Sequence, residues 1–148
     1  PSTKTVRLMQ PRLTHIALHV EQLEPCVQFY EKYCGLRIIH RRQHKHKQVV
    51  WLAEQGREQD FVMVLLPGGH KQQARIDDFS HLGFAVDSKA QVDVIAKLAE
   101  EDGILVWPPI QEDFPVGYYC GVLDPNGHYV EFSYGQPLGP GAEASKLD

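Results

Sequence analysis

The chain contains an internal repeat, and this repeat constrains its fold more than any other feature of the sequence. The segment THIALHVE, residues 14–21, matches SHLGFAVD, residues 80–87, in residue type at nearly every position, at an offset of 66 residues. Both segments alternate in the manner of a β-strand and carry a hydroxyl residue and a histidine at the start. A chain made of two similar halves is expected to fold as two similar modules.

An amphipathic helix is expected after each of these segments. Apolar residues recur at helical spacing in both halves: Cys26, Phe29, Tyr30 and Tyr33 in the first, Val92, Ile95, Ala96 and Ala99 in the second. Pro25 suits a first helical turn, and Asp87 or Ser88 is placed to cap the second helix. Gly35 and Gly103 are placed to end the two helices.

Three further apolar segments complete each half as strands. They are LRIIH, VVWLAE and FVMVLL in the first half, and ILVW, GYYCGVL and HYVEFSY in the second. The order strand, helix, strand, strand, strand predicts an α+β fold. Neither half is long enough to bury its own sheet face. We therefore expect the two βαβββ modules to pack as one domain, with the strands forming a partly open, barrel-like cavity.

The expected single domain covers residues 13–135. Module one spans 13–67, a polar and glycine-containing linker spans 67–78, and module two spans 79–135. Residues 136–148 contain Pro, Gly and small polar residues with little to bury, which predicts a flexible tail.

The first strand of each module begins with a histidine that merits a functional explanation. His81 shares its strand face with the small residues Gly83 and Ala85, and His15 holds the equivalent position in module one. Glu131 lies in a strand of apolar and aromatic residues, where an unpaired carboxylate is costly. Two imidazoles and one carboxylate can form the facial triad that leaves open positions on a metal such as Fe(II).

Two motifs give the chain a resemblance to a known family. THIALHVEQLEPCVQFYEKYCGL resembles the opening signature of the vicinal oxygen chelate superfamily, and DPNGHYVEF is similar to the final hairpin of that superfamily. Its members include glyoxalase I, fosfomycin-resistance thiol transferases, bleomycin-binding proteins, methylmalonyl-CoA epimerase and extradiol dioxygenases. The resemblance covers about residues 13–135 and rests on the two motifs together with the repeat.

The resemblance implies a metal held by His15, His81 and Glu131. Fe(II) or Mn(II) is the favoured metal, with Ni(II) or Zn(II) as alternatives. Glyoxalase-like members generally carry a fourth ligand at the position of Met63 or Val64, and neither residue is a plausible ligand for a hard metal ion. The three-ligand pattern is closer to the extradiol dioxygenases and the fosfomycin-type transferases.

Each of these narrower resemblances is incomplete. Extradiol enzymes place an acid–base histidine where this chain reads EQDF, residues 58–61. His19, on the strand face of His15, is a candidate to replace it. Tyr119 is the candidate for the tyrosine that these enzymes carry in the seventh strand, with Tyr118 as the alternative. The basic residues that hold a phosphonate in the fosfomycin enzymes have no counterpart in WPPIQEDF or SYGQPLGPG, which disfavours a phosphonate substrate.

The other histidines are assigned to ordinary roles. The run HRRQHKHK, residues 40–47, is dense in positive charge, which would repel a cation, and is predicted to be a solvated hairpin edge. His70 is assigned to the linker. His128 is placed by strand parity on the face opposite Glu131 and is left out of the predicted site.

The composition of the chain limits the kinds of binding partner and the cellular compartment that we expect. A net charge of −4 gives no reason to expect nucleic acid, and no apolar run approaches the length of a membrane span. The N-terminal stretch lacks the apolar region of a signal peptide. Three cysteines without CxxC spacing favour reduced thiols and a cytoplasmic location.

Three functions therefore remain open from the sequence. The first is a metal-dependent enzyme of the dioxygenase kind, whose two histidines and one carboxylate chelate adjacent oxygens of a small substrate through the metal. The second is a lyase or isomerase similar to glyoxalase I. The third is a metal-free binding protein similar to the bleomycin-resistance members. The resemblance also implies a homodimer, and the three ligands are equally able to meet within one chain or across two.

Overall fold

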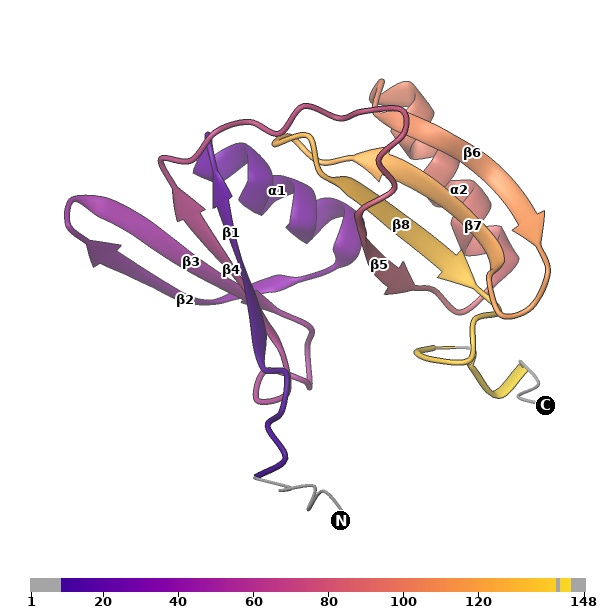
Figure 1. Ribbon diagram of the computed structural model, residues 1–148, viewed down its shortest axis with the longest axis horizontal. Helices are drawn as coiled ribbons and strands as arrows, with labels where there is room; N and C mark the ends of the chain where they lie inside the picture. Colours follow the sequence, from indigo (N-terminus) through magenta and orange to yellow (C-terminus); the bar gives the residue numbers. More distant parts are fainter. Residues whose placement is uncertain (1–8, 141, 145–148) are drawn as a thin grey trace, which may run out of the picture.

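The computed structural model describes residues 9–140 and 142–144 and shows two similar modules side by side (Figure 1). Module one contains β1 (His15–Val20), α1 (Leu23–Cys34), β2 (Arg37–His44), β3 (Lys47–Ala53) and β4 (Val62–Pro67). Its four strands form one sheet in the order β1-β4-β3-β2, in which β1 is parallel to β4 and the other neighbours are antiparallel.

Module two repeats this arrangement. It contains β5 (His81–Ala85), α2 (Lys89–Glu101), β6 (Leu105–Glu112), β7 (Gly117–Leu123) and β8 (Tyr129–Tyr134), and a short 3₁₀ helix, η1 (Ala142–Ala144), follows. The sheet order is β5-β8-β7-β6, with β5 parallel to β8. The predicted α+β fold of two βαβββ modules is confirmed, and the two sheets do not close into a barrel.

The helices begin and end where local chemistry favours it. Ser88 caps α2, because its hydroxyl accepts a hydrogen bond of 3.1 Å from the backbone N–H of Gln91. Gly35 follows α1 with φ of 65°, and Gly103 follows the α2 cap residue with φ of 74°. A positive φ is a conformation that glycine adopts without steric cost, so both glycines suit a helix end.

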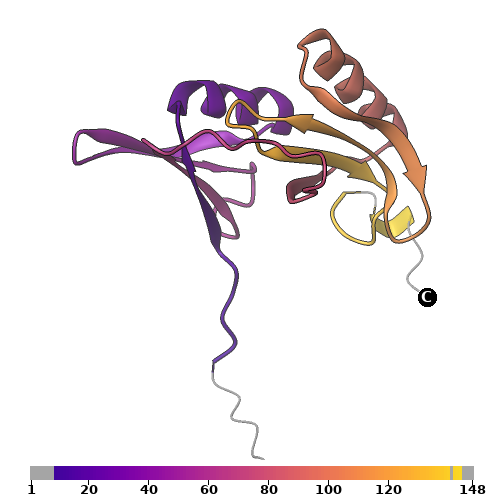
Figure 2. The same ribbon diagram turned by 45° about the horizontal axis from the view of Figure 1, so that its top comes forward.

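One hydrophobic core extends through both modules. The predicted face of α1 is buried, and Tyr30 is fully enclosed. In module two, Val92, Ala96 and Ala99 of α2 are buried beside Phe132 of β8, in the same cluster as Tyr30. Both helices lie on the same side of the sheets (Figure 2), so the opposite sheet faces carry the more exposed side chains.

The β7–β8 turn connects module two to module one. The turn is the predicted DPNG segment, and the side chain of Asn126 accepts a hydrogen bond of 3.0 Å from the backbone N–H of Glu21. The backbone carbonyl of Asn126 accepts another, of 2.7 Å, from Gln72. Because Asn126 is buried, these bonds hold both module one and the linker to the turn.

Candidate functional site

The uncovered face of the second sheet brings His81 and Glu131 together. The imidazole Nε2 of His81 lies 3.7 Å from a carboxylate oxygen of Glu131. His81 opens β5, and Glu131 lies in the adjacent strand β8 opposite Gly83. As expected, small residues leave space on this face of the sheet. Glu131 is only 7% exposed although it carries a carboxylate.

A backbone contact sets the orientation of the His81 ring. Its Nδ1 lies 2.6 Å from the backbone carbonyl oxygen of Phe79. Because a carbonyl oxygen only accepts hydrogen bonds, Nδ1 carries a hydrogen, which leaves Nε2, 3.7 Å from Glu131, as the ring nitrogen that could bind a metal. Metal-binding histidines are commonly fixed in this way by a carbonyl on the other ring nitrogen.

The environment of Glu131 favours a positive partner. Burial raises the pKa of Glu131, and the nearby carboxylate of Glu112 raises it further, whereas His81 and a hydrogen bond from Gln136 act in the opposite direction. The net result is a pKa above the ordinary glutamate value. A divalent cation bound beside Glu131 would stabilise its charged form.

Aromatic side chains line the pocket of about 300 Å³ that contains His81 and Glu131. The ring of Trp107 stacks on Tyr129 at a centroid distance of 4.9 Å and meets the His81 ring edge-on at 5.7 Å. The indole of Trp107 lies directly over Gly121, where a Cβ atom would overlap it. The remaining lining residues are Phe79, Glu112, Val116 and Tyr119.

Tyr119 lies in this pocket, as the sequence suggested for it, and Tyr118 does not. The hydroxyl of Tyr119 donates a hydrogen bond of 3.0 Å to Glu112. Burial and this hydrogen bond raise the pKa of Tyr119, so its hydroxyl stays protonated at neutral pH. Tyr118 instead donates to Asp93 of α2 on the other side of the sheet.

Glu112 is a pocket residue that the sequence reasoning missed. It ends β6, and the pairing of β6 with β7 shifts register twice, between Leu105 and Trp107 and between Trp107 and Ile110. Each shift changes which side chains face the pocket, so counting alternate residues along WPPIQE does not identify Glu112.

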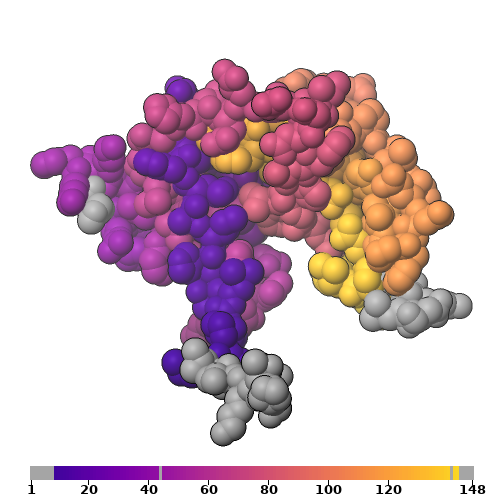
Figure 3. Space-filling view, in the orientation of Figure 1, coloured from indigo at the N-terminus to yellow at the C-terminus, as the bar shows by residue number. Residues whose placement is uncertain are grey.

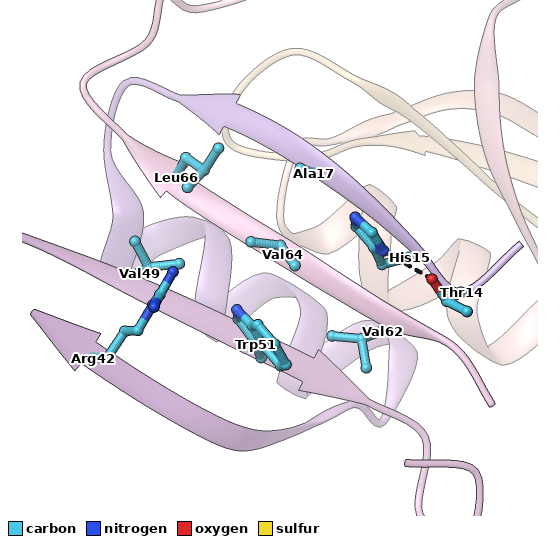
Figure 4. A pocket seen from close by; sticks show the side chains of 9 residues that line it. All are labelled: Thr14, His15, Ala17, Arg42, Val49, Trp51, Val62, Val64 and Leu66. Atoms are coloured by element: carbon cyan, nitrogen blue, oxygen red, sulfur yellow. Dashed lines mark hydrogen bonds between the residues drawn. The ribbon is translucent and has the colours of Figure 1, made fainter. Parts of the chain in front are cut away.

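His15, the third predicted ligand, lies in a different pocket. It lines a cavity of about 360 Å³ on the uncovered face of the first sheet, and its Nδ1 lies 3.0 Å from the hydroxyl of Thr14 (Figure 4). Within the described ranges, no group of three His, Cys, Asp or Glu side chains is close enough to hold a metal. The chain thus brings two of its three predicted ligands together and places the third elsewhere.

Strand register identifies the residue of module one that corresponds to Glu131. Gly83 pairs with Glu131 in the second sheet, and Ala17, its repeat equivalent, pairs with Val64 in the first. Val64 lines the His15 pocket (Figure 4). Of the two candidates for the missing fourth ligand, Val64 is therefore the one at the equivalent position, and its side chain has no donor atom.

Neither His19 nor His128 lines these two pockets, whereas the ring of His40 meets Trp51 of the His15 pocket edge-on at a centroid distance of 5.3 Å. His19, the predicted acid–base residue, has its Nε2 3.1 Å from the backbone carbonyl of Pro67 and lines a separate pocket with Lys45 and Lys47. The ring of His128 contacts Asp124 at 3.2 Å on the side of the sheet away from Glu131. The structure therefore brings neither residue to the His81–Glu131 pair.

A family model and one relative each match most of the chain. A family model described as the Glyoxalase/Bleomycin resistance protein/Dioxygenase superfamily matches residues 12–132. An uncharacterized protein of Pseudomonas aeruginosa is 59% identical over 136 residues, which cover 92% of this chain and 97% of that protein.

Solved structures show the same architecture. A possible glyoxalase from Bacillus cereus is 28% identical, with a TM-score of 0.62 over 82% of this chain and 96% of that chain. The fosfomycin resistance protein FosX from Listeria monocytogenes, complexed with Mn(II) and a dihydroxypropylphosphonic acid, has a TM-score of 0.68 over 84% of this chain and 92% of its own. At 17% identity, this second likeness shows the fold alone.

Proposed function

Because the chain belongs to the Glyoxalase/Bleomycin resistance protein/Dioxygenase superfamily, we propose that it is a divalent-metal-dependent enzyme acting on a small molecule with two adjacent oxygen atoms. The family match agrees with the vicinal oxygen chelate resemblance of the two sequence motifs. The metal, its ligands and the reaction are the parts of the proposal that go beyond family membership.

The observation that supports a metal most strongly is the geometry of His81 and Glu131. Nε2 of His81 lies 3.7 Å from a carboxylate oxygen of Glu131, and the opposite ring nitrogen is held by a backbone carbonyl. Nitrogen and carboxylate donors of this kind suit Fe(II) or Mn(II), with Ni(II) or Zn(II) as alternatives. Burial raises the pKa of Glu131, so a cation bound beside it would stabilise its charged form.

We assign the third ligand to His15 of a second copy of the chain. His15 and His81 are repeat equivalents at the starts of β1 and β5, and both are presented on uncovered sheet faces. In a homodimer, the first sheet of one protomer can face the second sheet of its partner, which brings the two kinds of pocket together. Twofold symmetry then generates two identical sites.

An apolar hollow between the modules supports such a dimer. The hollow, of about 720 Å³, is open on one side of the molecule (Figure 3) and is lined by side chains of both modules. Leu13 and Leu138 line it and are 82% and 62% exposed. Exposed apolar surface at such a position is typical of a protein interface.

The bound metal would act as a Lewis acid that polarises two substrate oxygens. The chain supplies the acid–base groups beside it. Glu112 is the pocket carboxylate that we assign to accept a substrate proton, and the hydroxyl of Tyr119 holds Glu112 in position. Trp107 and Phe79 give the pocket an apolar wall. His19 remains a predicted acid–base residue, with no contact to this pocket in one chain.

Two reactions fit this arrangement. Three ligands leave several positions on the metal for a bidentate substrate and oxygen, which favours ring cleavage by a dioxygenase. A carboxylate base beside the metal equally favours isomerisation similar to that of glyoxalase I. Oxygen uptake with catechols, compared with turnover of 2-oxoaldehydes, separates the two.

A metal-free binding protein is the second candidate. The separation of His15 from His81 and Glu131 within one chain is the observation that favours it. In that case the two open pockets would bind an apolar molecule without chemical change.

Metal content tests the proposal. Protein purified anaerobically without chelator should contain about one metal ion per chain by plasma mass spectrometry, and Glu131→Ala should lose it. Glu100→Ala, which removes an exposed carboxylate on α2, is the matched control and should retain the metal. Absence of metal from the unmodified protein, even after reconstitution with Fe(II), Mn(II), Ni(II) and Zn(II), would leave the binding-protein function instead.

A further inference from the structure

Arg42 is the one cationic lining residue of the His15 pocket apart from the histidine itself (Figure 4). The two consecutive arginines of β2 point to opposite faces of the sheet. Arg41 faces α1, where its guanidinium lies 2.6 Å from Glu24. Arg42 faces the uncovered side, where it lines the pocket with Val49, its partner across the β2–β3 pair.

None of the described residues that line the pocket neutralises the positive charge of Arg42. No carboxylate among the described residues lies within ion-pair distance of its guanidinium, and none of the pocket residues is acidic. By contrast, Arg37, Arg41, Arg57 and Arg75 each pair with a carboxylate. A guanidinium presents a planar set of N–H donors that matches a carboxylate in a bidentate manner.

Apart from Thr14, His15 and Arg42, the lining of the pocket is apolar. The indole of Trp51 lies between Arg42 and His15 in Figure 4, and it is 36% exposed. Four aliphatic side chains form the floor around it: Val49, Val62, Val64 and Leu66. A cavity of about 360 Å³ with this lining suits a small planar molecule stacked on the indole.

We propose that this pocket recognises an aromatic carboxylate. Arg42 binds the carboxylate, Trp51 stacks on the ring, and the opposite end of the ring lies toward His15. This inference rests on the proposed function, because His15 is there a metal ligand and the ring oxygens are the atoms that the metal chelates. It adds the substrate class: a ring with two adjacent oxygens and an anionic group at its far end.

Calorimetric titration of the full-length, chelator-treated protein tests the proposal without any metal. The probes are a dihydroxybenzoate with adjacent hydroxyls, the corresponding amide, and the corresponding phenylphosphonate. The carboxylate should bind at least about tenfold more tightly than the amide, as expected for a charge-assisted hydrogen bond. Equal affinities for the carboxylate and the amide would overturn the proposal, as would a phosphonate that binds more tightly than the carboxylate.

Variants of Arg41 and Arg42 test whether Arg42 is the residue responsible for the preference for the carboxylate over the amide. Arg42→Gln should abolish the preference for the carboxylate over the amide. Arg42→Lys should retain part of it, because lysine keeps the charge and loses the planar donor pair. Arg41→Gln is the matched control on the same strand and should leave the preference unchanged. A preference that survives in Arg42→Gln would overturn the assignment, and Arg42→Lys supplies the test if the glutamine variant does not fold.

Metal content of Arg42→Gln separates this proposal from the proposed function. The variant should bind the same amount of metal as the unmodified protein. If the unmodified protein binds no metal but prefers the carboxylate, the metal function is wrong and the carboxylate site stands. If it binds metal and shows no preference for the carboxylate, the carboxylate site is wrong.

Discussion

The hydroxyl of Tyr30 donates a hydrogen bond of 2.6 Å to the carboxylate of Asp124, and this bond joins module one to module two. Tyr30 is fully buried in α1, and Asp124 is 4% exposed in the β7–β8 turn. Asp124 also accepts hydrogen bonds from the backbone N–H groups of Asn126 and His128. A buried carboxylate with this many donors is stabilised in its charged form.

Removal of the Tyr30 hydroxyl should therefore destabilise the protein. Tyr30→Phe keeps the ring in the core but leaves Asp124 without one donor. We expect a loss of about 1.5–3 kcal/mol in the free energy of unfolding, the usual value for a hydrogen bond to a charged group. Urea denaturation followed by circular dichroism measures it. Tyr129→Phe, which removes an exposed hydroxyl bonded to the carbonyl of Arg75, is the control. An equal loss in the two variants would contradict the prediction.

Asp124 should also make the stability of the folded protein depend on pH in the acidic range. Burial by itself would raise the pKa of Asp124, but hydrogen bonds from His128 and Tyr30 outweigh this and hold its pKa below the ordinary value. A carboxyl whose pKa is lower in the folded state stabilises the fold above its unfolded pKa, about 3.9, and this contribution is lost as the pH falls through the folded value.

The stability gap between the unmodified protein and Asp124→Asn should consequently shrink as the pH falls below about 4. Thermal or urea unfolding at pH values from 6 down to about 2.5 measures the gap, because the amide does not titrate in this range. A gap that stays constant over this range would show that Asp124 acts through shape alone and not through its charge.

Mixed dimers can show whether the metal site is shared between protomers. His15→Ala and Glu131→Ala should each lose the metal when produced alone. When the two variants are co-expressed at equal levels, about half of the dimers are mixed, and each mixed dimer has one intact site. We expect about a quarter of the unmodified metal content from this preparation. No recovery would indicate that His15 does not complete the site of a second copy.

Gly121 should be required for the shape of the His81–Glu131 pocket. A Cβ atom at this position would overlap the indole of Trp107, whereas a Cβ atom at Gly83 would lie 3.6 Å from Glu131, an ordinary contact distance. Gly121→Ala should displace Trp107 and cost about 1–3 kcal/mol, as overpacking usually does. Near-ultraviolet circular dichroism detects the displaced indole. Gly83→Ala is the control on the same face and should leave the spectrum unchanged.

The repeat predicts the fold well because the periodic spacing of apolar residues within each segment determines whether that segment forms a strand or a helix. The alternation in residues 14–21 and 80–87, and the helical spacing of Cys26, Phe29, Tyr30 and Tyr33, are properties of single elements, and the structure confirms these strands and helices. The position of one module relative to the other depends on contacts such as that between Tyr30 and Asp124, which are 94 residues apart. The DPNG motif predicts a turn at Asp124, but nothing in the motif indicates that Asp124 binds Tyr30.

Some residues of the candidate site could likewise be predicted from local patterns in the sequence, and others could not. His81 and Glu131 are adjacent because two neighbouring strands keep regular register, which a parity argument can follow. Glu112 was missed because the register of β6 shifts, and Arg42 was missed because it lies in a basic run that reads as solvated surface. The tail predicted for residues 136–148 lies partly outside the described residues. Among those described, no helix has the length and apolar character to cross a membrane.

Val64 makes the two sheets chemically unequal. It occupies the strand position that Glu131 occupies in the other sheet, so a repeated framework carries a carboxylate on one side and a hydrocarbon on the other. The pocket on the first sheet is lined by one imidazole, an indole and a guanidinium among its larger polar or aromatic groups, whereas the pocket on the second contains an imidazole and two carboxylates. Under the function proposed above, the first module would bind the organic part of the substrate and the second would supply most of the metal ligands.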